Sequence, residues 1–91
     1  MALFYGKHKV KDYATWRPYF DGDQASLEAA SAKTVSVMQS TNDPNEVHFI
    51  FDVANPPAFF ELMQSPRLTE LMQTAGVLET PSVYQLQELP H

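Results

Sequence analysis

His8 is the residue of this sequence best suited to proton-transfer chemistry. It lies in an alternating row with Phe4, Gly6 and Val10, whose side chains are apolar or absent. A neutral imidazole in an apolar cleft can act as a general base. Gly6 has no side chain, so we expect it to leave space for a ligand beside His8. The alternative is a structural histidine whose ring is hydrogen-bonded within the core or exposed at the end of a strand.

Aromatic side chains near this histidine form a second group of candidates. Trp16 and Phe20 could form the flat wall of an aromatic ligand site. Tyr13, Tyr19 and Tyr84 could direct hydroxyl groups to a carbonyl or phenol of the same ligand. We therefore predict a substrate site made of these five residues around the histidine. Packing of the first helix onto the sheet is the alternative, because aromatic residues at helical spacing also build cores.

A third candidate pair lies on a later strand. His48 and Asp52 are four residues apart, which places them on one face of a strand but well separated along it. Lys7 and Lys9 are expected across the central strand pair. We predict ion pairs at a dimer seam from these residues, with a catalytic pair as the alternative.

The sequence gives little support for a metal or a cofactor. It contains no cysteine and three histidines, His8, His48 and His91. His8 and His48 are expected on opposite faces of the sheet, so they should not share an ion. A histidine could ligate haem, but basic residues for its propionates are few. No nucleophile elbow or phosphate-binding loop is present, and we predict no metal and no cofactor.

Length and charge restrict the class of protein. Ninety-one residues predict one domain, residues 1–91. A chain this short has a thin core, no disulfide can reinforce it, and association with a second copy is a common remedy. The formal net charge of −5 argues against a nucleic-acid partner, which requires clustered Lys and Arg.

The distribution of apolar residues argues against a membrane protein. No stretch approaches the roughly 18 apolar residues of a membrane span. The first five residues carry no cationic leader, so we expect no signal peptide. We expect a cytoplasmic protein.

Periodicity and turn signals predict the order βαββαβ. Strands are expected at residues 3–10, 34–40, 46–53 and 82–89. Asp12 is expected to cap the first helix, and Asn55 begins a second helical region that ends at Gly76. The predicted fold is an α+β, ferredoxin-like domain with a four-stranded antiparallel sheet in the order 4-1-3-2 and helices on one face.

Alternation assigns side chains to the two faces of this sheet. The face under the helices is expected to hold Phe4, Gly6, His8 and Val10; Val35 and Val37; Val47, Phe49, Phe51 and Val53; Tyr84 and Leu86. The opposite face mixes apolar residues such as Leu3, Met38 and Ile50 with polar ones. Such a face is less polar than a solvent face usually is, so we predict a homodimer with the sheets packed together as a dimeric α+β barrel.

The chain resembles a group of small bacterial proteins described as cyclase-like dimeric α+β barrels. The resemblance lies in residues 8–13 with 16–21, in the Asp-Pro-Asn-Glu-Val turn at 43–47, and in residues 65–68 with the helix end at 76–77. It covers nearly the whole chain. It also implies a relation to the antibiotic biosynthesis monooxygenase-like superfamily.

That superfamily includes cofactor-independent monooxygenases, polyketide cyclases, haem-degrading enzymes and stress-response proteins. The resemblance therefore implies a cleft for a small aromatic or polyketide-like molecule, with His8 as base in a monooxygenase- or cyclase-like reaction. The alternative is a non-catalytic, stress-associated or structural binding protein. Fold analogy alone does not separate an enzyme from a binding protein.

Overall fold

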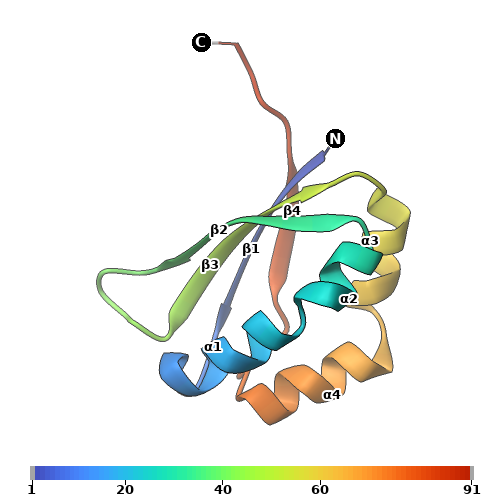
Figure 1. The fold of residues 1–91 in the computed structure, drawn as a ribbon. Helices are drawn as coiled ribbons and strands as arrows, with labels where there is room; N and C mark the ends of the chain where they lie inside the picture. The colour runs from blue at the N-terminus through green and yellow to red at the C-terminus, as the bar shows by residue number, and fades with distance from the viewer. Residues whose placement is uncertain (1, 91) are drawn as a thin grey trace.

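The computed structural model describes residues 2–90 as one layer of sheet and one layer of helices (Figure 1). The elements in chain order are β1 (Ala2–Lys9), α1 (Tyr13–Gly22), α2 (Gln24–Ala29), β2 (Ala32–Gln39), β3 (Glu46–Val53), α3 (Pro56–Met63), α4 (Pro66–Ala75) and β4 (Ser82–Leu86). Asp23 divides the first helical region, so that α1 and α2 are separate helices.

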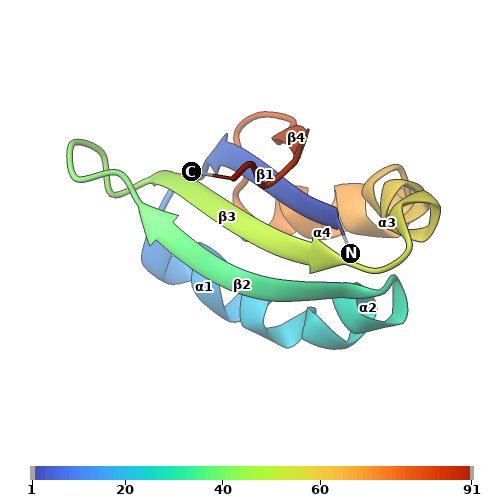
Figure 2. The same cartoon turned by 90° about the horizontal axis from the view of Figure 1, so that it is seen from above.

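The four strands are all antiparallel, in the order β2-β3-β1-β4. This confirms the predicted order. The helices lie on one side of the sheet, and the view in Figure 2 looks onto the face that they leave open. The β2–β3 hairpin projects beyond the helical layer in both views.

Side-chain caps begin α1, α3 and α4, and a glycine ends α4. The Asp12 carboxylate accepts hydrogen bonds from the backbone N–H and the hydroxyl of Thr15, at 3.0 and 2.8 Å. Asn55 caps α3 and Ser65 caps α4 in the same manner. Gly76 ends α4 with a φ of 87°, a left-handed conformation that glycine adopts without a steric penalty. The predicted caps and helix end are confirmed.

The core lies between the helices and alternate residues of β1 and β3. Phe4, Val47, Phe49, Phe51 and Val53 are all buried, as alternation predicts. On the helical side, the buried residues include Trp16, Leu27, Phe59 and Leu68. The two central strands are therefore assigned to the correct faces.

The edge strand β4 is assigned to the wrong faces by the sequence analysis. Tyr84 pairs with Tyr5 and Leu86 with Leu3, whose side chains are on the open face. Tyr84 and Leu86 are consequently exposed, at 55% and 45%. Val83 opposes Gly6 instead and packs against the core. Pairing with β1 decides the face of this five-residue strand, and its own apolar residues do not.

The prediction for Val35 is also wrong. The register of β2 against β3 shifts between Thr34 and Ser36, so that Thr34 opposes Phe51 and Ser36 opposes Ile50. Val35 is the extra residue of this irregularity and is 57% exposed. An inserted residue reverses the alternation along one strand, and periodicity in that strand cannot show where it occurs.

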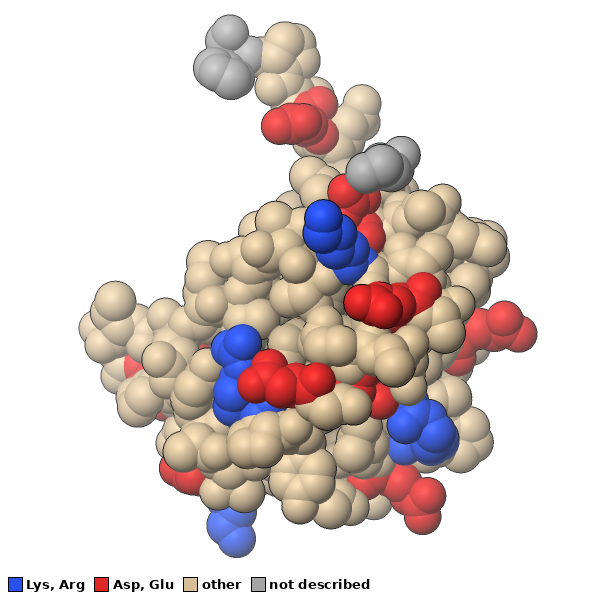
Figure 3. Space-filling model, in the orientation of Figure 1, with Lys and Arg blue, Asp and Glu red and all other residues tan. Residues whose placement is uncertain are grey.

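The surface is acidic overall and its charges are mixed. On the face shown in Figure 3, the Lys and Arg side chains of the described residues lie singly among acidic ones and form no continuous basic patch. No helix within residues 2–90 has both the length and the apolar character needed to cross a membrane.

Candidate functional site

His8 is the one polar side chain in the buried core of residues 2–90. It is 4% exposed, on β1 opposite Val47 of β3. Its ring meets the rings of Trp16 and Phe49 edge to face, with both centroid distances at 5.4 Å. Within the described part of the chain, neither ring nitrogen has a hydrogen-bond partner. Packing, including that against these two aromatic rings, holds the imidazole without a hydrogen bond from the described residues.

Burial changes the acid–base properties of this imidazole. Desolvation lowers the pKa of His8 from its ordinary value of 6.5 to about 4. The ring is therefore neutral near pH 7, with one nitrogen donating and the other accepting. A buried polar group without a partner costs roughly 1–3 kcal/mol of stability, so such groups are rare in native cores and call for an explanation.

The segment that follows His8 is positioned by a helix cap and by contacts with the β2–β3 hairpin. The Asp12 cap starts α1 directly after β1 and turns Trp16 back over the strand. Asn45 of the hairpin accepts a hydrogen bond from the Tyr13 backbone N–H at 3.0 Å through its side chain. Its carbonyl accepts a second one from the Val10 N–H at 2.9 Å. The turn between β2 and β3 is therefore hydrogen-bonded to the connection between β1 and α1.

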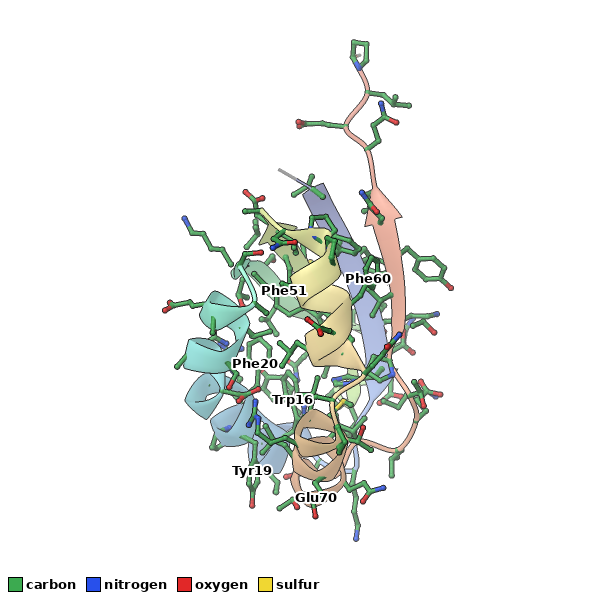
Figure 4. The ribbon with its side chains drawn as sticks, turned by 90° about the vertical axis from the view of Figure 1, so that its right-hand side faces the viewer. Trp16, Tyr19, Phe20, Phe51, Phe60 and Glu70 are labelled. Atoms are coloured by element: carbon green, nitrogen blue, oxygen red, sulfur yellow. The ribbon has the colours of Figure 1, made fainter. Side chains whose placement is uncertain are left out.

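A cavity of about 70 Å³ extends from His8 between the sheet and the helices and opens to solvent. Trp16, Tyr19 and Phe20 of α1 line one wall, and α4 and the end of α3 provide the other. Figure 4 shows Trp16, Phe20 and Phe51 in the interior, whereas Tyr19 lies at the outer margin of α1. A dry cavity of about 150 Å³ can hold benzene. Only part of an aromatic ring would therefore fit without movement of the side chains that line the mouth.

Four of the six predicted site residues lie together on this cavity. They are His8, Trp16, Tyr19 and Phe20. Tyr13 packs against Trp16, but its hydroxyl accepts a hydrogen bond from Arg17 Nη1 at 3.0 Å and does not line the cavity. Tyr84 does not line it either, because it stacks on Tyr5 on the open face of the sheet.

The expected space above Gly6 is filled. A Cβ atom at Gly6 would collide with the ring of Phe49, which lies directly on the glycine backbone. The missing side chain thus admits a core phenylalanine and not a ligand. The cavity beside His8 lies toward α4 instead, where Leu71, Met72 and Ala75 line it.

Several lining residues were not among the sequence candidates. Asp23 lines the cavity at the α1–α2 junction, and Met63, Leu68 and Met72 reach it from α3 and α4. The apolar spacing of α4 predicts that Leu68 and Met72 face inward. It carries no information about whether they meet the same space as His8, because that depends on how two distant helices pack.

The open face carries a second polar group, most of whose members have a partner, although Oδ1 of Asp52 on the same face is buried without one among residues 2–90. Tyr5 is hydrogen-bonded to Nδ1 of His48, and Nε2 of His48 lies 2.9 Å from a carboxylate oxygen of Glu46. Lys9 pairs with Asp43 at 3.8 Å. The predicted ion pairs of Lys7 and Lys9 with His48 and Asp52 are therefore not formed within the described chain.

The positions of the histidines and carboxylates decide whether they could share a metal ion. His8 and His48 lie on opposite faces of the sheet, as predicted, and His91 is outside the described residues. Nowhere in residues 2–90 do three side chains of metal-binding type gather in one place.

Solved structures share this fold over nearly its whole length. An antibiotic biosynthesis monooxygenase is 15% identical with a TM-score of 0.71, covering 99% of this chain and 100% of that chain. A proposed antibiotic biosynthesis monooxygenase from Bordetella bronchiseptica is 14% identical with a TM-score of 0.74 and the same coverage. Rv0793 from Mycobacterium tuberculosis is 13% identical with a TM-score of 0.66, covering 99% and 96%.

These likenesses confirm the predicted ferredoxin-like α+β fold and its relation to the fold of the antibiotic biosynthesis monooxygenases. At such identities they carry the fold and no activity. No family model matches the chain, and no curated protein matches its sequence.

The lowered pKa of His8 predicts a specific loss of stability in mild acid. As the pH falls below 6.5, the unfolded chain binds a proton at His8, whereas the folded chain does so only near pH 4. The stabilising contribution is thus complete above pH 6.5 and is lost between 6.5 and 4. We expect the free energy of unfolding to fall by about 2 kcal/mol from pH 7 to pH 5 because of this residue.

Urea unfolding of the wild type and of His8→Phe at both pH values measures this contribution. The variant keeps a buried aromatic ring that cannot be protonated. Between pH 7 and pH 5 its free energy of unfolding should therefore fall by about 2 kcal/mol less than that of the wild type. Parallel losses in the two proteins would contradict a desolvated neutral His8.

Proposed function

We propose that this chain binds a small, largely apolar planar molecule in the cavity beside His8. The observation that carries the proposal is the imidazole itself, buried with both nitrogens unpartnered at the wall of an apolar cavity. A ligand hydroxyl or carbonyl would supply the hydrogen bond that the core does not. The aromatic walls would hold the rest of the ligand by stacking and dispersion.

The reaction class that fits this arrangement begins with removal of a proton. A cofactor-independent monooxygenase or a polyketide cyclase-like enzyme acts on a hydroxylated aromatic or polyketide-like substrate that forms a delocalised anion. His8 is the base in this proposal. Its pKa of about 4 makes it a weak base in the unliganded protein. An anion that forms beside the ring would stabilise the imidazolium, so proton transfer would require the substrate to be in place.

A non-catalytic binding protein is the second candidate. Two observations favour it: the small volume of the cavity, and the low basicity of His8 before a ligand binds. In that case the same hydrogen bond selects the ligand and no proton leaves it. Consumption of dissolved oxygen, or conversion of a phenolic substrate by protein free of added cofactor, separates the two candidates.

Phenol and toluene differ by the hydroxyl group that His8 is proposed to bind. Trp16 is the only tryptophan and lines the cavity, so its fluorescence reports both ligands. Wild type should bind phenol about tenfold more tightly than toluene, since one satisfied buried hydrogen bond contributes on the order of 1 kcal/mol or more. His8→Phe should lose this preference and favour toluene, because the phenol hydroxyl would be buried without a partner. His48→Phe alters a histidine on the other face and should behave as wild type. Equal affinities in wild type would contradict the role of His8.

We also propose that a second copy of the chain covers the open sheet face. This face carries exposed Tyr84, Leu86 and Met38, at 55%, 45% and 40%. Basic and acidic side chains, such as Lys7 and Glu46, lie on the same face, so two copies related by a two-fold axis can pair opposite charges. A thin core in each copy makes this additional burial favourable.

Light scattering after size exclusion should therefore report twice the chain mass of 10.3 kDa. Tyr84→Glu places a charge on the proposed interface and should shift the protein toward the monomer. Leu78→Glu introduces the same charge at a residue that is 65% exposed and outside the four strands, and should leave the mass unchanged. A monomeric wild type at high concentration would overturn the proposed dimer.

A further inference from the structure

Asp23 is the one residue with a formal charge near pH 7 that lines the cavity among residues 2–90. It lies at the junction of α1 and α2, and its side chain is 12% exposed. The remaining lining is apolar except for the neutral imidazole of His8 and the hydroxyl of Tyr19 at the rim. A carboxylate at the wall of such a cavity strongly affects which ligands can enter, because charges are poorly screened there.

The orientation of this carboxylate is fixed by Arg67. Asp23 occupies the N-cap position of α2, yet its side chain makes no capping hydrogen bond. Oδ1 instead accepts from Nη2 of Arg67 at 3.0 Å, and the same nitrogen donates to the hydroxyl of Ser26 at 2.7 Å. Within residues 2–90, no donor is hydrogen-bonded to Oδ2. One oxygen is therefore anchored, and the other can accept a hydrogen bond from a ligand.

The charges around the cavity oppose the entry of an anion. His8 is neutral near pH 7 and provides no positive charge. Arg67 is already paired with Asp23, and its side chain is 56% exposed to solvent. The chain as a whole carries a formal charge of −5. An anionic ligand would lose its hydration and meet a carboxylate, whereas a hydroxyl or ammonium group would meet an acceptor.

We propose that Asp23 determines the specificity of this cavity by selecting ligands that carry a hydrogen-bond donor, neutral or cationic, at the end remote from His8. Anionic ligands are rejected. The inference rests on the proposed function, since it concerns the same cavity. It adds a second polar contact, so that a preferred ligand has an apolar body between two polar ends.

The competing role for Asp23 is purely structural. Its ion pair with Arg67 joins the α1–α2 junction to α4 and would stabilise the helical layer whatever the ligand. Loss of such a pair would lower stability and would weaken all ligands to a similar extent. A selective effect on charged ligands distinguishes the two roles.

Four one-ring probes test the proposal at neutral pH through Trp16 fluorescence: toluene, benzyl alcohol, benzylamine and benzoate. Wild type should bind benzylamine at least about tenfold more tightly than benzoate, the scale of a hydrogen bond to a charged group. Benzyl alcohol should bind more tightly than toluene. In Asp23→Asn, which keeps an oxygen for Arg67, the ratio of benzylamine to benzoate affinity should fall toward one. The affinity for toluene should be unchanged.

Asp21→Asn is the matched control. Asp21 is two residues away on α1, pairs with Arg17 and does not line the cavity, so its replacement removes the same charge from the surface. It should retain the wild-type ratio. If Asp23→Asn also retains that ratio while toluene still binds, the inference is wrong and the proposed function stands. If none of the four probes perturbs Trp16 in wild type, both fail.

Discussion

Burial of the His8 ring without a hydrogen-bond partner is the constraint on which the rest of this structure depends. The ring lies on a central strand, under Trp16 and against Phe49, and is 4% exposed. The Asp12 cap and the Asn45 contact hold the start of α1 next to β1, and Trp16 in the first turns of α1 lies against the imidazole. A phenylalanine at this position would avoid the cost of an unpartnered polar group. The neutral imidazole is thus explained by a ligand more readily than by stability.

The histidines on the two faces of the sheet differ in their hydrogen bonding. His48 has a partner at each nitrogen, Tyr5 at one and Glu46 at the other. This is the usual arrangement for a polar group in a structural role. His8 has none, and a cavity lies beside it. The contrast within one small protein supports the proposed role of His8 in ligand binding and a structural role of His48 on the open face.

Alternation in the sequence predicts the fold and the central strands because β1 and β3 are long and half buried. In each of these eight-residue strands, apolar residues alternate clearly, so only one assignment of side chains to the two faces is consistent. That assignment places His8 under the helices. The same reasoning fails for β4, whose five residues carry Val83 on one face and Tyr84 and Leu86 on the other. In β2 it fails only at Val35, the residue of the irregularity, whereas Val37 packs against the core as predicted.

For a related reason, the sequence predicts only the part of the candidate site that is formed by β1 and α1. Trp16, Tyr19 and Phe20 follow β1 directly, so local spacing brings them to His8. Asp23, Leu68 and Met72 reach the cavity through the packing of α2 and α4, which no local pattern specifies. Gly6 shows a second limit of sequence reasoning. A glycine indicates that another group lies close to the backbone, but it does not identify that group. Here that group is Phe49.

Nitrogen NMR of the protein labelled at its histidine rings tests the central claim most directly, since each ring nitrogen reports its own protonation and hydrogen bonding. The account predicts that His8 remains neutral down to pH 5 and titrates near pH 4. It also predicts that phenol shifts the His8 nitrogen resonances while those of His48 stay in place. A His8 ring that titrates near pH 6.5, or one whose nitrogens do not respond to saturating phenol, would contradict the account.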